Sequence, residues 1–250
     1  MKITRRGFVK VGVVAGAGLT LGIWRLTRPA GLPATDAAFA PNAYLTIDTD
    51  GSITVLVDRS EMGQGVATAL PQLLAEELDV PWERVAFEFA PAHAAYGMQV
   101  TGGSTSVPQA WSSMRQAGAS ARWLLREAAA REWGVPSESL DTRDGRVVGP
   151  DGATLAYEDL ALAAAALDVE LPEEVPLKGP ADFTLIGRST PRLDVPAKVT
   201  GQAVFGIDAG PAEARIAMVA RPPVFGGRVR SFDPAAALAV DGVHEVVELD

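Results

Sequence analysis

The sequence predicts an α+β fold in two parts, and three observations carry this prediction. Apolar residues alternate in two short runs on either side of Asp50-Gly51, which is typical of a β-hairpin. Apolar and small residues recur at helical spacing over 107–133. An acidic, proline-rich stretch at 168–183 then separates the first part, 41–167, from a β-patterned second part, 184–250.

The first part is expected to alternate between strands and helices. In chain order we expect strands at 44–47 and 53–57, a helix at 66–78, a strand at 84–89, a helix at 107–133, a strand–turn–strand at 140–148 and a helix at 157–167. Pro71 interrupts the hydrogen-bond ladder of the helix at 66–78. That helix therefore either kinks or begins near Pro71.

One face of the helix at 107–133 carries a stripe of residues whose side chains are small in the middle of the helix and large at its ends. The stripe consists of Trp111, Met114, Gly118, Ala121, Leu125 and Ala128. Small residues allow another backbone to approach closely, so we expect a close packing partner there. Four tryptophans are better explained by packing than by stacking on a substrate: Trp82, Trp111, Trp123 and Trp133.

Composition excludes several functions. A net charge of −9 and a pI near 4.8 argue against nucleic-acid binding, which requires a basic face. The absence of cysteine excludes disulfides, thiolate zinc sites and iron–sulfur ligation, and two histidines far apart make a protein-held transition metal improbable. Any redox metal is therefore expected inside an organic cofactor, with the electron relay on another chain.

The first 40 residues are expected to form an export signal. Thr4–Lys10 contains a twin-arginine motif, and a Gly/Ala-rich apolar run follows it at 11–24. Such segments address folded bacterial proteins to the twin-arginine export machinery, so we expect a periplasmic location. Ala38-Phe39-Ala40 resembles a cleavage site, but Pro41 should hinder cleavage. An uncleaved tether to the inner membrane therefore stays open, as does an ordinary basic N-terminus with a short anchor.

Two glycine-rich motifs, Glu61-Met62-Gly63-Gln64-Gly65 and Thr101-Gly102-Gly103-Ser104-Thr105-Ser106, each precede an expected helix. Such turns present unpaired N–H groups at the positive end of a helix dipole, which suits an anion. The hydroxyls of the second motif add donors and can cap its helix. The Gln64 amide can face the edge of a heteroaromatic ring. Alone, each motif is more simply a turn before a helix, and neither matches a Walker loop or a Rossmann fingerprint.

Together with Ala75-Glu76-Glu77-Leu78 and Arg115–Ala119, the motifs resemble the molybdopterin-binding subunits of the xanthine dehydrogenase/aldehyde oxidoreductase family. The nearest branch looks like the isoquinoline 1-oxidoreductase beta subunits. Pro191–Gly201 and Arg221–Gly227 resemble the start of that family's α/β-hammerhead domain. The resemblance covers 42–250. It implies part of a molybdopterin-binding domain at 41–167, a linker at 168–183 and an incomplete hammerhead domain at 184–250.

The resemblance also implies the cofactor and its contacts. The cofactor is expected to be molybdopterin cytosine dinucleotide with molybdenum. The residues expected to contact its pterin and phosphates are Gly63, Gln64 and Gly65, and those expected to line it are Thr101, Gly102, Gly103, Ser104 and Thr105. Glu61 is expected to be structural, accepting hydrogen bonds from the N–H groups of its own loop.

The family hydroxylates a carbon beside a ring nitrogen or oxidises an aldehyde, with oxygen from water. By resemblance, the substrate is an aromatic heterocycle or an aldehyde, and electrons pass to a separate iron–sulfur subunit or a haem protein. The family's catalytic glutamate lies in a Gly-x-Gly-Glu motif that this sequence lacks, so no catalytic residue is assigned. We expect the N-terminal portion of a longer subunit. The alternative is a non-catalytic exported binding or assembly protein derived from that family.

Simple structural explanations are preferred for the remaining polar residues. The pairs Glu76/Glu77 and Glu173/Glu174 are expected on solvated surfaces, and His93 is expected to be simply exposed. Arg115 and Arg122 can pair either with phosphate or with acidic neighbours, and the sequence leaves both alternatives open.

Overall fold

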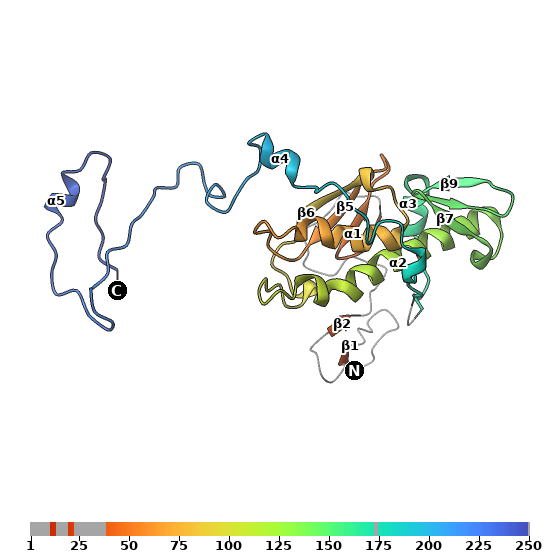
Figure 1. Cartoon of the computed structure of the whole chain (residues 1–250), viewed down its shortest axis with the longest axis horizontal. Coiled ribbons are helices and arrows are strands. Elements are labelled where there is room, and N and C mark those ends of the chain that lie inside the picture. Colours follow the sequence, from red (N-terminus) through yellow and green to blue (C-terminus); the bar gives the residue numbers. More distant parts are fainter. Residues whose placement is uncertain (1–10, 14–19, 23–38, 173–174, 250) are drawn as a thin grey trace. The chain divides into compact units, whose positions relative to one another are not determined.

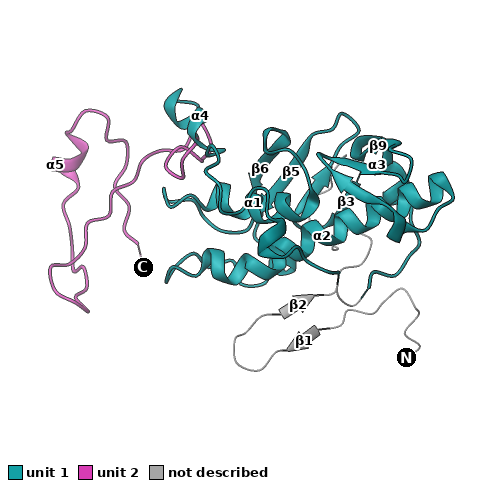
Figure 2. Ribbon diagram, turned by 45° about the vertical axis from the view of Figure 1, so that its right-hand side comes forward, with its two compact units in different colours: residues 1–203 teal, residues 204–250 magenta. Residues whose placement is uncertain are grey.

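The computed structural model describes residues 11–13, 20–22, 39–172 and 175–249. Contacts divide the chain into two units, 1–203 and 204–250 (Figure 2). The twin-arginine motif at 4–10 and the pair Glu173/Glu174 lie outside the described residues. Within the described part no helix is long and apolar enough to span a bilayer.

The first unit is built on a four-stranded sheet with strand order β3-β4-β5-β6 (Figure 1). Its strands are β3 (Phe39–Asn42), β4 (Leu45–Ile47), β5 (Ile53–Val57) and β6 (Val85–Phe89). The pairs β3–β4 and β4–β5 are antiparallel, whereas β5 and β6 are parallel. The chain crosses from β5 to β6 through a helix, and the register pairs Val57 with Phe89 at the carboxyl ends of both strands.

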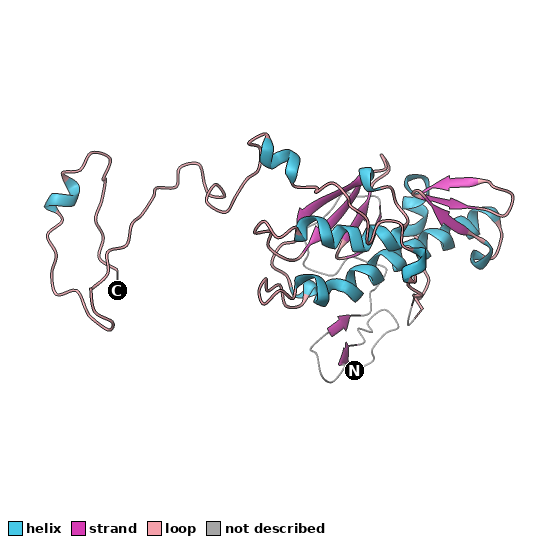
Figure 3. Cartoon of the chain, in the orientation of Figure 1, coloured by secondary structure: helices cyan, strands magenta, loops and turns pink. Residues whose placement is uncertain are grey.

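Three helices accompany this sheet, α1 (Val66–Leu78), α2 (Ser106–Trp133) and α3 (Tyr157–Ala165) (Figure 3). Helix α1 contacts β5 and β6, and α2 packs along α1. A Cβ atom added to Gly118 of α2 would lie 2.3 Å from the carbonyl oxygen of Leu74 in α1. The small centre of the α2 stripe therefore allows the close approach that the sequence predicts. Helix α1 begins at Val66, before Pro71, which lies inside it.

A second, antiparallel sheet lies beyond the end of α2, with strand order β7-β8-β9. Its strands are β7 (Asp141–Arg143), β8 (Arg146–Val148) and β9 (Thr154–Ala156). The strand–turn–strand expected at 140–148 is confirmed, and Asp144 and Gly145 at its turn both have positive φ, 50° and 74°. The described residues also contain four short 3₁₀ turns: Trp82–Arg84, Ala94–Tyr96, Ser137–Ser139 and Pro180–Asp182.

Two features near the N-terminus differ from the sequence expectation. Strands β1 (Val11–Val13) and β2 (Thr20–Gly22) form an antiparallel pair within the apolar run. Strand β3 begins inside the segment expected to be the signal, and the Phe39 side chain is only 2% exposed and belongs to the core. The fold therefore uses residues that the predicted cleavage site would remove.

The expected linker and second part also take a different form. Residues 178–194 make many hydrogen bonds to α1, and the contact division falls after Ala203 rather than near 168–184. The β-rich expectation for 185–250 is wrong for the described residues, which contain only the helices α4 (Val195–Val199) and α5 (Ala235–Leu238) and no strand there. Alternating apolar residues form a strand only when another strand accepts their backbone hydrogen bonds. In 204–249 the apolar side chains are instead exposed, as at Ile207, Ile216 and Phe225.

Candidate cofactor-binding site

The two glycine motifs lie at one edge of the main sheet. The first follows β5 and the second follows β6, and these parallel strands end side by side. Ligands of open α/β sheets bind in the crevice outside the carboxyl ends of parallel strands. The Ser60 N–H donates to Thr101 Oγ1 at 2.8 Å, which joins the motifs directly. The structure thus brings together two motifs that lie about forty residues apart.

The first glycine loop is organised around the Glu61 carboxylate. Glu61 Oε1 accepts from the N–H groups of Gly63 (2.7 Å) and Gly65 (2.9 Å), and Oε2 accepts from Ala67 (2.9 Å). Gly63 and Gly65 have φ of 99° and 90°, a backbone region that side chains rarely adopt. Burial alone would raise the pKa of Glu61, but these three N–H groups lower it below its usual value. The predicted structural role of Glu61 is confirmed.

The Gln64 side chain folds back onto the same loop. Its Nε2 donates to the Ser60 carbonyl at 2.8 Å, and its Oε1 accepts from the Met62 N–H at 2.5 Å. One hydrogen of the amide therefore closes the loop, while its second has no acceptor among the described residues. The contact of Gln64 with a cofactor ring stays a prediction.

The second glycine loop is closed differently. Thr105 donates to the Gly102 carbonyl through both its N–H (3.2 Å) and its Oγ1 (2.9 Å). Because the hydroxyl is used inside the loop, it does not cap α2, and neither Ser104 nor Ser106 caps it either. The second role that the sequence allowed for these hydroxyls, a cap on α2, is therefore not found among the described residues. Gly103 and Ser104 have φ of 59° and 57°, so these two residues adopt a left-handed backbone conformation just before α2.

The N-terminus of α2 is left without an anion of its own. The first turn contains no acidic residue. Within the described part of the chain, nothing accepts from the N–H groups of Gly103, Ser104, Ser106 and Val107. By contrast, Glu61 occupies the N-terminus of α1. The donors available to an external anion therefore lie at α2, where the macrodipole of a 28-residue helix adds to them.

The space and the surroundings also fit a large ligand that is partly apolar. Cβ atoms added to Gly63 or Gly102 would meet nothing within 4 Å. Apolar side chains on the same loops are exposed, including Met62 at 71% and Met98 at 74%. Backbone N–H donors, hydroxyls and an apolar rim are the groups that a phosphate-bearing heteroaromatic cofactor requires.

His93 has a structural role in the loop between β6 and the second motif. Its Nδ1 accepts from the Ala95 N–H at 3.1 Å, and its own N–H donates to Gln99 Oε1 at 2.9 Å. Gln99 Nε2 in turn donates to the Pro91 carbonyl at 3.0 Å. His93 is half-buried rather than simply exposed, which corrects the sequence expectation.

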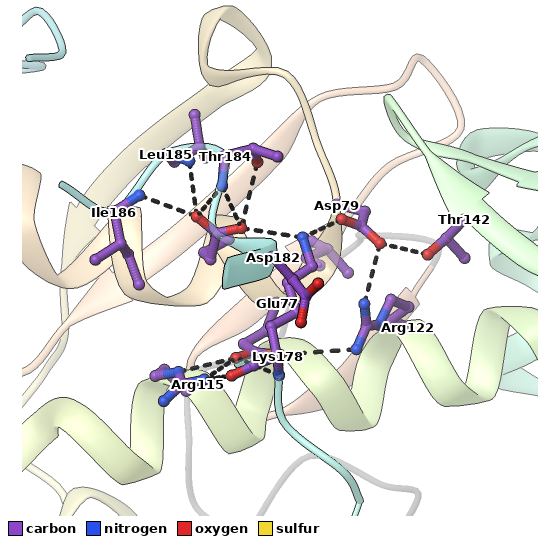
Figure 4. Close-up of polar contacts among 12 residues, drawn as sticks. Glu77, Asp79, Arg115, Arg122, Thr142, Lys178, Asp182, Thr184, Leu185 and Ile186 are labelled. Carbon is purple, nitrogen blue, oxygen red and sulfur yellow. Dashed lines mark hydrogen bonds and ion pairs between the residues drawn. The ribbon is translucent and has the colours of Figure 1, made fainter. Parts of the chain in front are cut away.

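The expectation for Glu76 and Glu77 is also wrong, because both residues are 0% exposed. Glu77 Oε1 accepts from Arg115 Nε (2.8 Å) and Nη2 (2.6 Å), and Arg122 pairs with Asp79 at 3.0 Å (Figure 4). Both arginines thus pair with acidic neighbours, which resolves the alternative that the sequence left open. The partners of α1 lie far along the chain, so helical periodicity alone could not reveal this burial.

The sequence profile of the molybdopterin cofactor-binding domain matches residues 4–207. The chain belongs to this family. The resemblance to the molybdopterin-binding subunits of the xanthine dehydrogenase/aldehyde oxidoreductase family is thereby confirmed. For this molybdopterin-binding chain, the two joined glycine loops are the candidate cofactor site, although the contacts assigned to Gly63–Gly65 and Thr101–Thr105 stay predictions.

Three curated relatives support the assignment. The chain is 34% identical to a membrane-bound aldehyde dehydrogenase [pyrroloquinoline-quinone] of Gluconacetobacter polyoxogenes, over 99% of this chain and 33% of that protein. It is 31% identical to the beta subunit of isoquinoline 1-oxidoreductase of Brevundimonas diminuta, over 100% of this chain and 37% of that subunit. It is also 31% identical to the B subunit of nicotinate dehydrogenase of Pseudomonas putida, over 79% of this chain and 17% of that subunit. The molybdopterin-binding chain thus spans about a third or less of the length of these relatives.

Proposed function

We propose that this chain is the N-terminal part of a molybdenum hydroxylase large subunit, and that it binds the anionic part of the cofactor at the N-terminus of α2. The observation that carries this proposal is the difference between the two helix starts. The Glu61 carboxylate accepts from the N–H groups at the start of α1, whereas α2 has no acid in its first turn and its first N–H groups have no acceptor among the described residues. Membership of the molybdopterin-binding family supports a phosphate of that cofactor as the anion that these donors would bind.

Several residues would hold the cofactor. The N–H groups of Gly103, Ser104, Ser106 and Val107 would bind phosphate oxygens, and the hydroxyls of Ser104 and Ser106 would add donors. The cofactor, when bound, supplies the molybdenum that takes electrons from the substrate. We propose the cytosine dinucleotide form, because its second phosphate offers further acceptor oxygens to this large donor set.

The reaction, partners and location of the whole protein follow as proposals. The relatives' names include isoquinoline, nicotinate and aldehyde, which favours hydroxylation of an N-heteroaromatic ring or oxidation of an aldehyde. This part of the protein contains no cysteine and so cannot itself ligate an iron–sulfur cluster, which supports a separate iron–sulfur subunit or a haem protein as the electron acceptor. The Arg5-Arg6 motif supports export by the twin-arginine machinery to the periplasm, with the N-terminus as a tether if it is not cleaved.

Substitution of Ser106 by Asp tests the site. A carboxylate at the first position of α2 would occupy the free N–H groups and repel an anionic cofactor, while stabilising the helix by about 0.3–1 kcal/mol. We expect the complete gene product carrying S106D to lose most of its molybdenum while its Tm is unchanged or higher. S112D is the matched control, because it adds the same charge at an exposed position of the same helix. Equal molybdenum contents in S106D, S112D and wild type would contradict the site.

The cofactor itself is tested on the native complex. We expect molybdenum by elemental analysis, a fluorescent oxidised pterin, and cytidine nucleotide after hydrolysis. One relative's name specifies pyrroloquinoline quinone, so that quinone is assayed in the same extract. A complex that contains the quinone without molybdenum would overturn the proposal. A complex with neither cofactor would favour the non-catalytic binding or assembly protein.

A further inference from the structure

Residues 184–194 form a strap that runs along α1 from its C-terminal end to its N-terminal end. Glu76 carboxylate oxygens accept from the N–H groups of Thr184 (3.0 Å), Leu185 (2.7 Å) and Ile186 (2.9 Å). Figure 4 shows these three N–H groups directed at one carboxylate. The first contact between the strap and α1 therefore lies at the last turn of this helix.

The strap continues along the same side of the helix. Gln72 Nε2 donates to the Leu185 carbonyl at 2.9 Å and to Thr190 Oγ1 at 3.3 Å. Thr68 Oγ1 accepts from the Leu193 N–H at 3.0 Å. Positions 68, 72 and 76 are four residues apart and therefore share one helical face. This polar face of α1 directs the strap towards the first glycine loop.

Arg192 lies at the end of the strap and contacts that loop. Its Nη1 donates to the Gly63 carbonyl at 3.1 Å, and its Nη2 lies 3.4 Å from Glu61 Oε1. Asp194 orients the guanidinium by accepting from Nε (2.9 Å) and Nη2 (2.7 Å), and it also pairs with Lys198. The side chains of Glu61 and Asp194 are each 7% exposed, so Arg192 bridges two nearly buried carboxylates.

This arrangement has an electrostatic consequence for the site. Three accepted N–H bonds favour the ionised form of Glu61, and its negative charge lies in the loop beside which an anionic cofactor would bind. Arg192 is the cation that contacts this carboxylate among the described residues. Its planar guanidinium can serve Glu61, Asp194 and the Gly63 carbonyl together, which a single ammonium could not do with the same geometry.

We propose that Arg192 is a positioning residue of the cofactor site: it neutralises Glu61 and fixes the first glycine loop so that an anionic cofactor can lie beside it. The inference rests on the proposed function for the identity of the cofactor. The contacts of Arg192 with the loop do not depend on that identity. The strap thereby makes the first glycine loop dependent on residues more than a hundred positions away.

The test compares R192Q with R188Q in the complete gene product. Arg188 is exposed on the same strap and makes no ion pair among the described residues, so R188Q removes the same charge without touching the loop. We expect R192Q to lower the molybdenum content and to weaken cofactor retention about tenfold, because the loop loses charged hydrogen bonds and Glu61 is no longer neutralised. Hydrogen exchange at the amides of residues 63–67 should accelerate in R192Q alone.

A charge-conserving variant separates the charge of Arg192 from the geometry of its hydrogen bonds. R192K keeps a positive charge beside Glu61 but cannot contact Glu61, Asp194 and the Gly63 carbonyl together. We therefore expect cofactor retention in R192K to exceed that in R192Q several-fold, while exchange at 63–67 stays faster than in wild type. Retention in R192K that is no better than in R192Q would contradict the neutralisation of Glu61. If R192Q does not fold, R192K is compared with R188Q, and equal retention and equal exchange in these two variants would overturn the inference.

The outcomes distinguish the two proposals. Wild type without molybdenum refutes the proposed function, while the exchange measurement still reports whether Arg192 fixes the loop. Wild type with molybdenum, together with equal retention and equal exchange in R192Q and R188Q, overturns the inference about Arg192 alone.

Discussion

At the scale of single residues, Gly118 sets the distance between α1 and α2. A Cβ atom added at this position would lie 2.3 Å from the Leu74 carbonyl oxygen, well inside van der Waals contact. We expect G118A to lower the free energy of unfolding by about 1–3 kcal/mol, because overpacking outweighs the helix propensity of about 1 kcal/mol that alanine gains over glycine. Urea denaturation measures the change. S112A, at an exposed position of α2, should be neutral, and an equally small effect of G118A would contradict the close contact.

Glu76 stabilises the fold through its buried contacts with Lys178 and the strap. Its carboxylate is 0% exposed and is bonded to Lys178 at 3.0 Å and to the N–H groups of the strap. E76Q keeps the shape but removes the charge, and breaking a buried ion pair costs about 3–5 kcal/mol. We expect a loss of that order and faster proteolysis within 184–194. E83Q, on an exposed glutamate, is the control, and a matching stability for both variants would refute the buried network.

At the scale of elements, β3 limits where the N-terminus can be processed. Phe39 is 2% exposed, and Asn42 at the other end of β3 donates to the Ala117 carbonyl at 3.2 Å. We expect F39A to destabilise the protein by about 3–5 kcal/mol, as for other buried phenylalanines. N-terminal sequencing of the protein purified from its source cell should accordingly find a chain that still contains Phe39. A mature chain beginning at Pro41 with full stability would show that β3 is dispensable.

At the scale of the whole molecule, the bonded carboxylates predict acid sensitivity. The Arg192 guanidinium holds the pKa of Asp194 well below its usual range. Burial would raise the pKa of Glu76, but the N–H groups of Ile186, Leu185 and Thr184 lower it. Groups with a lowered folded pKa contribute stability above their unfolded pKa and lose it as the pH falls. Burial raises the pKa of Asp58 despite Arg59, so this carboxyl contributes to the pH dependence of stability with the opposite sign.

We therefore expect the Tm to be nearly constant from about pH 7 to 5 and to fall steeply below about pH 4.5, where carboxyl groups of unfolded chains bind protons. Differential scanning calorimetry across this range measures the profile. The profile of E76Q should fall less steeply, because one such carboxylate is absent. A wild-type Tm that is constant down to pH 3 would contradict the network.

The sequence alone predicted the helices at 66–78 and 107–133, the hairpin around Asp50-Gly51 and the family, since periodicity, turn residues and contiguous motifs are local properties. It also indicated the structural role of Glu61, whose partners lie within six residues. The tertiary structure decided the rest. Burial of Glu76, the position of Arg192 and the absence of strands among the described residues of 204–249 depend on partners distant in the chain. A side-chain pattern states what a segment can bury or pair with, but only the fold brings that partner within hydrogen-bonding distance.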